Sequence, residues 1–204
     1  MNSLEARERV RTHLLASAET KRRIADTCLE DILTAATIIT EALRAGGKVM
    51  LCGNGGSAAD SQHIAAELTS RLSAEFERPA LAAVALTTDT SFLTANANDY
   101  GFGYVFERQV EALGRKDDVL VGISTSGNSE NVVRAIRSCR ERGIKTIGLL
   151  GGTGGQIRNL VDVAIVVPST STQHIQEGHI AIGHIVCDLV ERAIFGQAIP
   201  QRKV

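Results

Sequence analysis

Aromatic residues and net charge are both scarce in this chain of 204 residues. Only 3% of the residues are aromatic, tryptophan is absent, and the formal net charge is −1. Nucleic-acid binding depends on a basic surface or on aromatic rings that stack against bases. The composition therefore argues against a nucleic-acid partner and favours small ligands.

Paired cysteines, an apolar leader and a membrane-length apolar run are also missing. The four cysteines form no CxxC pair, and the first ten residues contain no apolar core of the kind found in signal peptides. No charge-free apolar stretch is long enough to span a bilayer. We therefore expect a soluble protein of the reducing cytoplasm without a membrane partner.

The distribution of apolar residues predicts an α/β domain. The length and the 44% hydrophobic content fit one domain with a substantial core. Residues 3–45 are predicted to be a pair of helices with a break near Asp26 and an end at Gly46-Gly47. After Lys48, short apolar runs alternate with helical patterns, which predicts a five-stranded parallel sheet in a three-layer α/β/α sandwich. The predicted strands are 49–52, 81–86, 119–123, 146–150 and 163–167, and the predicted helices are 58–71, 104–113, 129–142 and 172–195.

A glycine loop that carries a serine follows the first predicted strand and opens directly into a helix. It reads CGNGGS over residues 52–57. Free backbone N–H groups and the positive end of the helix dipole make such a junction a seat for an anion, above all phosphate. The loop matches neither GxxxxGK[ST] nor GxGxxG, so a nucleotide is the less favoured ligand.

A second polar loop, with four hydroxyl groups in six residues, follows the predicted strand at 119–123. It reads STSGNS over residues 124–129. Serine and asparagine also favour helix N-caps, but one hydroxyl would be enough for a cap. We therefore favour phosphate binding. Loops at the carboxyl ends of neighbouring strands can share one ligand.

Two predicted helices carry residues suited to proton transfer or metal binding. His63 and Glu67 stand one turn apart on one helix, which by itself indicates no more than a surface pair. In the C-terminal helix, Gln176 and His184 can line one groove, whereas His179 lies in an apolar stripe and is expected in the core. Together, His63, Glu67, Gln176 and His184 could bind a divalent metal, or they could supply an acid and a base without one.

Taken together, the segments GNGGS, STSGNS and IQE (residues 175–177) closely resemble the sugar isomerase (SIS) domain family, and within it the phosphoheptose isomerases. The resemblance implies one SIS domain over residues 1–204 with a flavodoxin-like sheet, and residues 3–45 as an oligomerisation extension. It also implies isomerisation of sedoheptulose 7-phosphate to D-glycero-D-manno-heptose 7-phosphate through an enediol, at the start of ADP-heptose and lipopolysaccharide core biosynthesis.

The family's functional residues fall on matching positions of this chain. Glu67 matches the general base and His184 the histidine acid. The zinc ligands, where metal is present, match His63, Glu67, Gln176 and His184. The substrate contacts match Asn54, Gly55, Gly56, Ser57, Glu67, Asn98, Asp99, Ser124, Thr125, Ser126, Ser129 and Gln176.

One position departs from the family, and two other functions stay open. His174 stands where many relatives have arginine, which puts a loop or subunit contact in doubt. A non-catalytic SIS protein that binds the replication initiator is one alternative, although the presence of Glu67 and His184 favours the enzyme. A sugar-phosphate-binding regulator is the other, but it would normally carry a DNA-binding domain, for which the chain leaves no room.

Surplus apolar residues on the terminal helices predict self-association. Leu4, Val10, Leu14 and Leu15 precede a nearly continuous apolar run at 32–39, which is more than a helix covering one sheet needs. The resemblance implies a homotetramer with active sites at subunit boundaries. We therefore expect Gln176 or His184 to complete a site that contains Glu67 of another subunit.

Overall fold

The computed structural model describes residues 3–73 and 77–196, which form a parallel sheet between two layers of helices. The strand order is β2-β1-β3-β4-β5, and every neighbouring pair is parallel. This is the flavodoxin-like order, so the predicted α/β/α sandwich with five strands is confirmed. The strands are β1 (Val49–Gly53), β2 (Ala83–Ala85), β3 (Val119–Ser124), β4 (Lys145–Gly151) and β5 (Val163–Val167).

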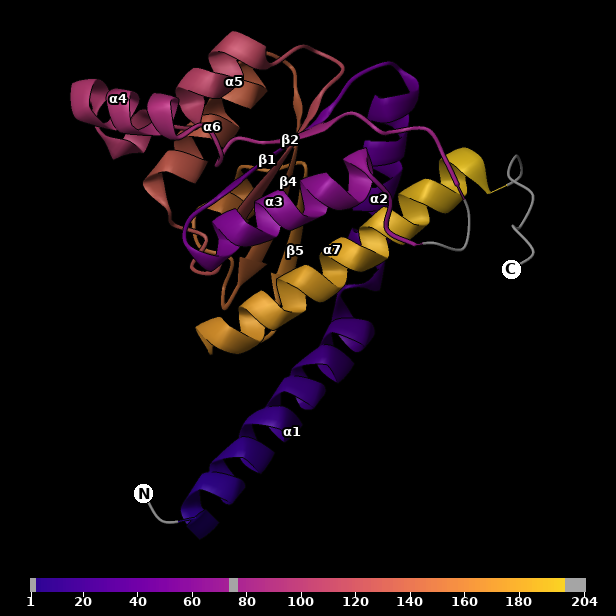
Figure 1. The fold of residues 1–204 in the computed structure, drawn as a ribbon, viewed down its shortest axis with the longest axis vertical. Coiled ribbons are helices and arrows are strands. Elements are labelled where there is room, and N and C mark those ends of the chain that lie inside the picture. Colours follow the sequence, from indigo (N-terminus) through magenta and orange to yellow (C-terminus); the bar gives the residue numbers. More distant parts are fainter. Residues whose placement is uncertain (1–2, 74–76, 197–204) are drawn as a thin grey trace.

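Alternating strand residues build two separate cores, one on each face of the sheet. On one face, Leu51 and Ile123 pack with the helices α2 (Leu29–Arg44), α3 (Gly56–Thr69) and α7 (Thr172–Phe195). On the other, Met50 and Leu120 pack with α5 (Glu107–Leu113), α6 (Glu130–Glu141) and the short turn η2 (Ile157–Asn159). The turn η1 (Phe102–Tyr104) has no buried residue and leads into Val105 and Phe106, which join this core. The period of two along each strand sends neighbouring side chains to opposite faces. Figure 1 shows α3 and α7 running side by side across the first face.

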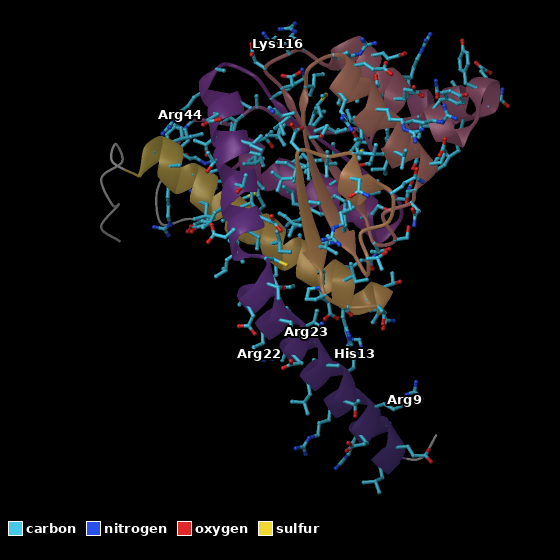
Figure 2. All side chains as sticks on the ribbon, turned by 180° about the vertical axis from the view of Figure 1, so that it is seen from behind. Arg9, His13, Arg22, Arg23, Arg44 and Lys116 are labelled. Atoms are coloured by element: carbon cyan, nitrogen blue, oxygen red, sulfur yellow. The ribbon has the colours of Figure 1, made fainter. Side chains whose placement is uncertain are left out.

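The helix α1 (Ser3–Thr27) extends away from this body. It breaks from α2 at Cys28, close to the break predicted near Asp26. Ser17, Thr20 and Ile24 are its buried residues, so Ile24 is the one hydrophobic side chain that α1 buries. Figure 2 shows charged and polar side chains following one another along the helix.

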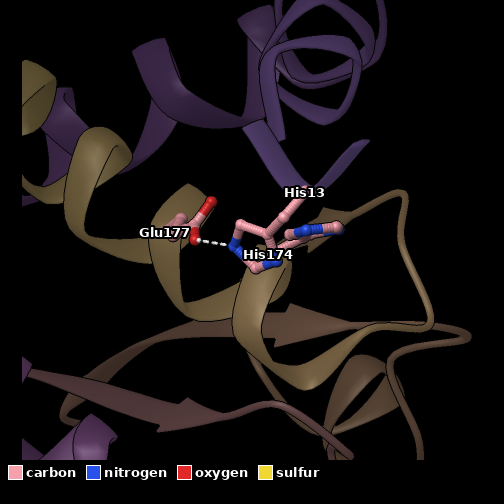
Figure 3. A group of neighbouring side chains, drawn as sticks. All are labelled: His13, His174 and Glu177. Carbon is pink, nitrogen blue, oxygen red and sulfur yellow. Dashed lines mark hydrogen bonds and ion pairs between the residues drawn. The ribbon is translucent and has the colours of Figure 1, made fainter. Parts of the chain in front are cut away.

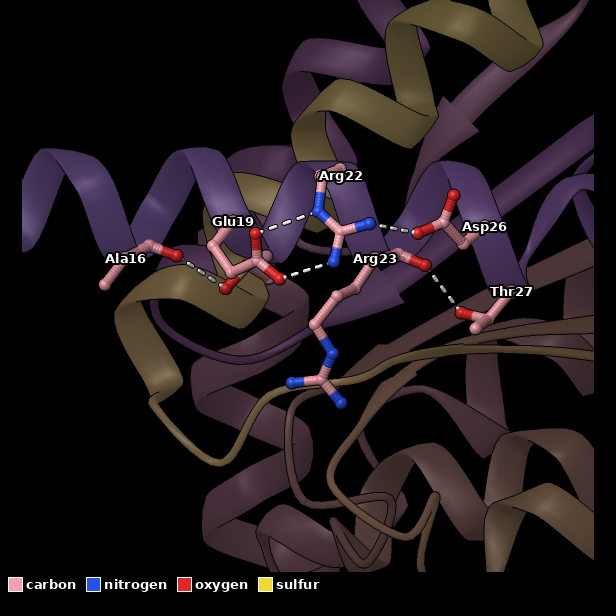
Figure 4. Close-up of polar contacts among 7 residues, drawn as sticks. Ala16, Glu19, Arg22, Arg23, Asp26 and Thr27 are labelled. Atoms are coloured by element: carbon pink, nitrogen blue, oxygen red, sulfur yellow. Dashed lines mark hydrogen bonds and ion pairs between the residues drawn. The ribbon is translucent and has the colours of Figure 1, made fainter.

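Charge pairs within α1 occupy part of its exposed surface. Arg22 donates to Glu19 at 2.9 and 2.8 Å and to Asp26 at 2.6 Å, as Figure 4 shows. Both carboxylates lie within one turn of the arginine, where side chains of a helix meet. These contacts stay within the helix and do not attach it to the sheet.

The structure adds one helix that the sequence did not predict. Residues 90–100 form α4 (Thr90–Tyr100), whose N-cap Asp89 accepts a hydrogen bond of 2.9 Å from the Phe92 N–H. The predicted helix 104–113 divides into η1 and α5, and the predicted strand 81–86 is ordered as a strand over Ala83–Ala85. No helix in the described ranges is long and apolar enough to cross a membrane.

Candidate active site

The two polar loops lie side by side at the point where the sheet's strand order reverses. β1 and β3 are neighbours in the sheet; the strand after β1 in the sequence, β2, lies on the outer side of β1, and the strand after β3, β4, lies on the opposite side of the pair. Ligands of open α/β sheets bind beyond the carboxyl ends of strands at such a point. Asn54 of the first loop and Asn131 of α6 exchange two amide hydrogen bonds of 2.9 Å. These bonds tie the first loop to the helix that follows the second.

The hydroxyl groups of the second loop do not cap α6. Ser129 occupies the N-cap position but makes no side-chain cap bond, and its Oγ shares a hydrogen bond of 2.9 Å with Ser124 Oγ. Ser126 is exposed and accepts from the Asn128 N–H at 3.2 Å. The start of α6 therefore keeps the anion-binding character expected of an N-terminus without a side-chain cap.

Close backbone contact holds the second loop against the loop after β4. Gly127 has φ +66°, and a Cβ there would lie 1.9 Å from the carbonyl oxygen of Gly154. The Gly127 carbonyl accepts from the Ile157 N–H at 3.0 Å, and Asn128 Oδ1 accepts from the Gln156 N–H at 3.0 Å. Only glycine fits position 127, and the loop after β4 holds the second loop in place.

His63, Glu67 and His184 meet where α3 packs against α7, and we call them the α3–α7 cluster. His63 Nε2 lies 2.9 Å from His184 Nε2 and 3.1 Å from Glu67 Oε1. The three potential ligand atoms lie within 4.8 Å of one another. A hydrogen bond between two imidazole nitrogens requires one to donate and the other to accept, so the two rings share this contact only when one of the two Nε2 atoms carries a proton.

Two features of the packing bring these side chains together. Gly183 allows α7 to approach α3, since a Cβ there would lie 2.7 Å from Ile64 Cδ1. Arg78 and Glu191, whose side chains are 0% and 2% exposed, form an ion pair beside the end of α3. Arg78 also donates to the Glu67 carbonyl at 2.7 Å. A close helix contact and a buried cation thus position Glu67.

Gln176 lies at the other end of this helix pair. A Cβ on Gly56 would be 2.5 Å from Gln176 Nε2, so the Gln176 amide rests against the first residue of α3. His63 is seven residues further along α3, or roughly 10 Å at the usual helical rise. The structure thus brings three of the four predicted metal ligands together and sets Gln176 beside the first loop, where Asn54, Gly55, Gly56 and Ser57 lie.

Asn98 and Asp99 are exposed at the end of α4. Asn98 Nδ2 donates to Asp99 Oδ1 at 2.9 Å. Leu93 and Ala97 of the same helix pack with the core on the side of α5 and α6, whereas α3 and α7 cover the opposite face. Within one chain these two residues therefore belong to the other helical layer.

One expectation about subunits needs correction. We expected Gln176 or His184 to reach a Glu67 of another subunit. His184 instead contacts His63 of its own chain, which itself lies 3.1 Å from Glu67. The expectation is wrong for His184, because the tight approach of α3 and α7 already unites these groups within one chain.

Two titratable residues near the site have shifted pKa values. Burial lowers the pKa of His179 to about 4, and this histidine, 0% exposed, donates from Nε2 to the Leu150 carbonyl at 2.9 Å. It is a neutral core residue, as predicted. Burial raises the pKa of Asp60, one turn before His63, and no described group hydrogen-bonds its buried Oδ2. Asp60 was not among the predicted site residues, although its position one turn before His63 on the same helix makes it a candidate.

Comparison with known proteins shows which family the chain resembles. The SIS domain family matches residues 13–151. A phosphoheptose isomerase from Nitratiruptor sp. is 55% identical over 186 residues, which cover 91% of this chain and 98% of that protein. The structure of a phosphoheptose isomerase from Neisseria gonorrhoeae gives a TM-score of 0.86 at 48% identity, covering 91% of this chain and 98% of the other. The structure of a phosphoheptose isomerase from Francisella tularensis gives a TM-score of 0.88 at 38% identity, covering 94% of this chain and 100% of the other.

The fold and the family match together define a SIS-domain protein. Within that class, the chain belongs to the phosphoheptose isomerase family, whose members are aldose–ketose isomerases.

Proposed function

We propose that this protein converts sedoheptulose 7-phosphate to D-glycero-D-manno-heptose 7-phosphate, the first step of ADP-heptose and lipopolysaccharide core biosynthesis. The observation that carries the proposal is the α3–α7 cluster, in which His63 Nε2 lies within 3.1 Å of both His184 Nε2 and Glu67 Oε1. This cluster and the phosphate-binding loops lie at different positions along α3. A substrate with its phosphate at one end of a seven-carbon chain and its reacting carbons at the other suits that arrangement.

The proposed reaction moves a proton between C1 and C2. Glu67 removes the proton from one carbon and returns it to the other, while His184 transfers the proton on the adjacent oxygen. When no metal occupies this nitrogen, His184 can accept or donate through Nε2, the atom that contacts His63. The side chain of Glu67 is 20% exposed, so the carboxylate is partly shielded yet still reachable by substrate.

The phosphate group is held by the two loops at the sheet's switch point. We assign Asn54, Gly55, Gly56 and Ser57 to one side and Ser124, Thr125, Ser126 and Ser129 to the other. The starts of α3 and α6 add backbone N–H groups and helix dipoles. Gln176, beside Gly56, contacts the substrate between its ends. We assign Asn98 and Asp99 to the sugar as well, across a subunit boundary, because within one chain they lie in the other helical layer.

The donor set of the α3–α7 cluster also fits a divalent metal. Two imidazoles and one carboxylate with ligand atoms within 4.8 Å are a donor set typical of catalytic zinc. We propose that His63, Glu67 and His184 hold Zn²⁺ and that Gln176, which rests against Gly56 at the other end of the helix pair, contacts the substrate rather than this metal. The metal, when bound, polarises the substrate carbonyl and stabilises negative charge on oxygen.

We also propose a cytoplasmic homotetramer with active sites at subunit boundaries. Exposed hydrophobic side chains along α1, such as Leu4, Val10, Leu14 and Leu15, support self-association. All four cysteines are free and buried, in keeping with a reducing compartment.

The test is to incubate the purified protein with sedoheptulose 7-phosphate and measure aldose phosphate, with and without a chelator. Glu67→Gln and His184→Gln should each lower kcat by roughly 10²–10⁴-fold, because each removes a proton-transfer group. Glu30→Gln, on the exposed surface of α2, is the matched control and should keep the wild-type rate. An inactive wild type that binds a replication initiator would favour the non-catalytic alternative instead.

A further inference from the structure

A second group of two histidines and a glutamate lies between α1 and the start of α7. It consists of His13, His174 and Glu177, which we call the α1–α7 cluster (Figure 3). His13 Nε2 lies 3.1 Å from Glu177 Oε1, and the His13 and His174 rings meet edge-on with centroids 4.6 Å apart. The three potential ligand atoms lie within 4.8 Å of one another. This group shares no residue with the α3–α7 cluster.

The hydrogen bonding of this cluster leaves it suited to a cation. His174 Nε2 is buried, and no described group hydrogen-bonds it. Ser17 donates to Glu177 Oε2 and His13 Nε2 lies 3.1 Å from Glu177 Oε1, so both carboxylate oxygens are held in place beside the two imidazoles. Lys21 donates to Ser17 Oγ at 3.0 Å and Arg9 lines the same groove as His13 and His174, so both are nearby competing cations. An unsatisfied buried nitrogen is costly, and a metal would use its lone pair.

The surroundings also leave room for a further ligand. An open groove of 910 Å³ runs along α1 and the start of α7, and His13 and His174 are part of its wall. Four-coordinate zinc holds nitrogen and oxygen ligands about 2.0–2.2 Å from the metal, which places ligand atoms roughly 3.3 Å apart. The 3.1 Å between His13 Nε2 and Glu177 Oε1 already matches this spacing, and rotation of the side chains can bring the His174 nitrogen to a similar distance. Water from the groove can supply the fourth ligand.

We propose that His13, His174 and Glu177 form a second site for Zn²⁺ or a similar imidazole-preferring divalent metal, which clamps α1 onto α7. Because α1 buries a single hydrophobic side chain, Ile24, contacts with Glu177 are a large part of its attachment. A metal shared by the two helices adds bonds that the unfolded chain cannot make, so its binding stabilises the docked helix. The site is structural and independent of the proposed isomerase reaction.

The experiment titrates metal-free protein with Zn²⁺ alone and counts bound metal by calorimetry and elemental analysis. In a His63→Ala/His184→Ala background, which removes two donors of the other cluster, the chain should still bind one Zn²⁺ per subunit. Adding His174→Arg should weaken this binding by at least about 100-fold, since it removes one ligand and adds a positive charge. Asp188→Asn, which removes an exposed carboxylate elsewhere on α7, is the matched control and should leave the binding unchanged.

A second measurement separates a clamp from a loosely bound ion. Zn²⁺ should slow backbone hydrogen exchange in the part of α1 around His13, and His174→Arg in the otherwise wild-type chain should abolish that effect while the sheet stays protected. The proposal fails if the His63→Ala/His184→Ala protein binds no Zn²⁺. It fails equally if His174→Arg leaves the affinity unchanged, or if the exchange of α1 does not respond to the metal.

Discussion

The α3–α7 and α1–α7 clusters contain the same donors on very different supports. α3 buries Ile64, Ala65 and Leu68 in the core, whereas α1 buries Ile24 alone among its hydrophobic residues. A site on a well-packed helix has its geometry before a ligand arrives, as catalysis requires. A site on a lightly packed helix acquires part of its geometry from the ligand. Similar donor sets therefore do not imply similar roles. The role of each cluster depends on how well the helices that carry it are packed.

The largest effect should come from breaking the support of the α3–α7 cluster. Arg78→Ala leaves Glu191 as a buried charge without its partner and should cost roughly 3–5 kcal/mol in the free energy of unfolding. Urea unfolding at a fixed protein concentration measures the loss. In the Arg78→Met/Glu191→Gln double variant no charge is buried, so much of the stability should return. A small loss in Arg78→Ala would mean that this pair does not support α3.

The pH dependence of stability should reveal how His179 holds α7 on the sheet. Its pKa in the fold is about 4, against 6.5 for an ordinary histidine, so the unfolded chain takes up this proton first as pH falls. The stabilisation is complete above pH 6.5 and should be lost towards pH 4, by about 3 kcal/mol in all.

His179→Gln keeps an N–H donor for the Leu150 carbonyl and does not titrate. Its unfolding free energy should fall less steeply than that of the wild type between pH 6.5 and 4. Parallel curves for the two proteins would show that His179 does not contribute to the acid sensitivity.

A moderate effect is expected at the second loop, which we propose holds the phosphate of the substrate. Ser126→Ala removes an exposed hydroxyl at the edge of the second loop and should raise KM by roughly 10-fold with little change in kcat, as for a contact remote from the reacting carbons. Steady-state kinetics, with inorganic phosphate as a competitor, measure both KM and kcat. Ser91→Ala, on the exposed start of α4, is the control. Unchanged kinetics in Ser126→Ala would exclude this phosphate contact.

The smallest effect is expected in α1. Arg22→Ala removes the ion pairs with Glu19 and Asp26, but the arginine side chain is 63% exposed and water replaces these contacts. The unfolding midpoint should match that of the wild type in the same assay that resolves Arg78→Ala. A clear loss of stability would show that α1 is more firmly integrated than its burial suggests.

Local patterns were enough to predict most of the fold. Short apolar runs separated by helical patterns predict buried parallel strands, and all five were found. α4 was missed because its sequence, TSFLTANANDY, mixes residues of weak helix propensity. What stabilises it is the cap of Asp89 and the packing of Leu93 and Ala97, which are properties of the folded chain.

The two clusters also combine features that the sequence reveals with features that only the folded chain shows. The spacing of His63 and Glu67 on one helix is visible in the sequence, and so are the two loops proposed to bind phosphate. The contact of His63 with His184 depends on how closely α3 approaches α7 at Gly183, which no local pattern reveals. The meeting of His13 with Glu177, 164 residues apart, depends on the direction in which α1 leaves Cys28.

The amide pair of Asn54 and Asn131 has a consequence for how this domain can be redesigned. Each side chain donates one bond and accepts the other, so the two positions form a self-complementary unit. Replacing one asparagine strands the polar atoms of its partner, whereas changing both to a matched apolar pair removes the conflict. Effects at the two positions will not add, and an engineered loop with altered sugar preference will tolerate new residues there only when both change together.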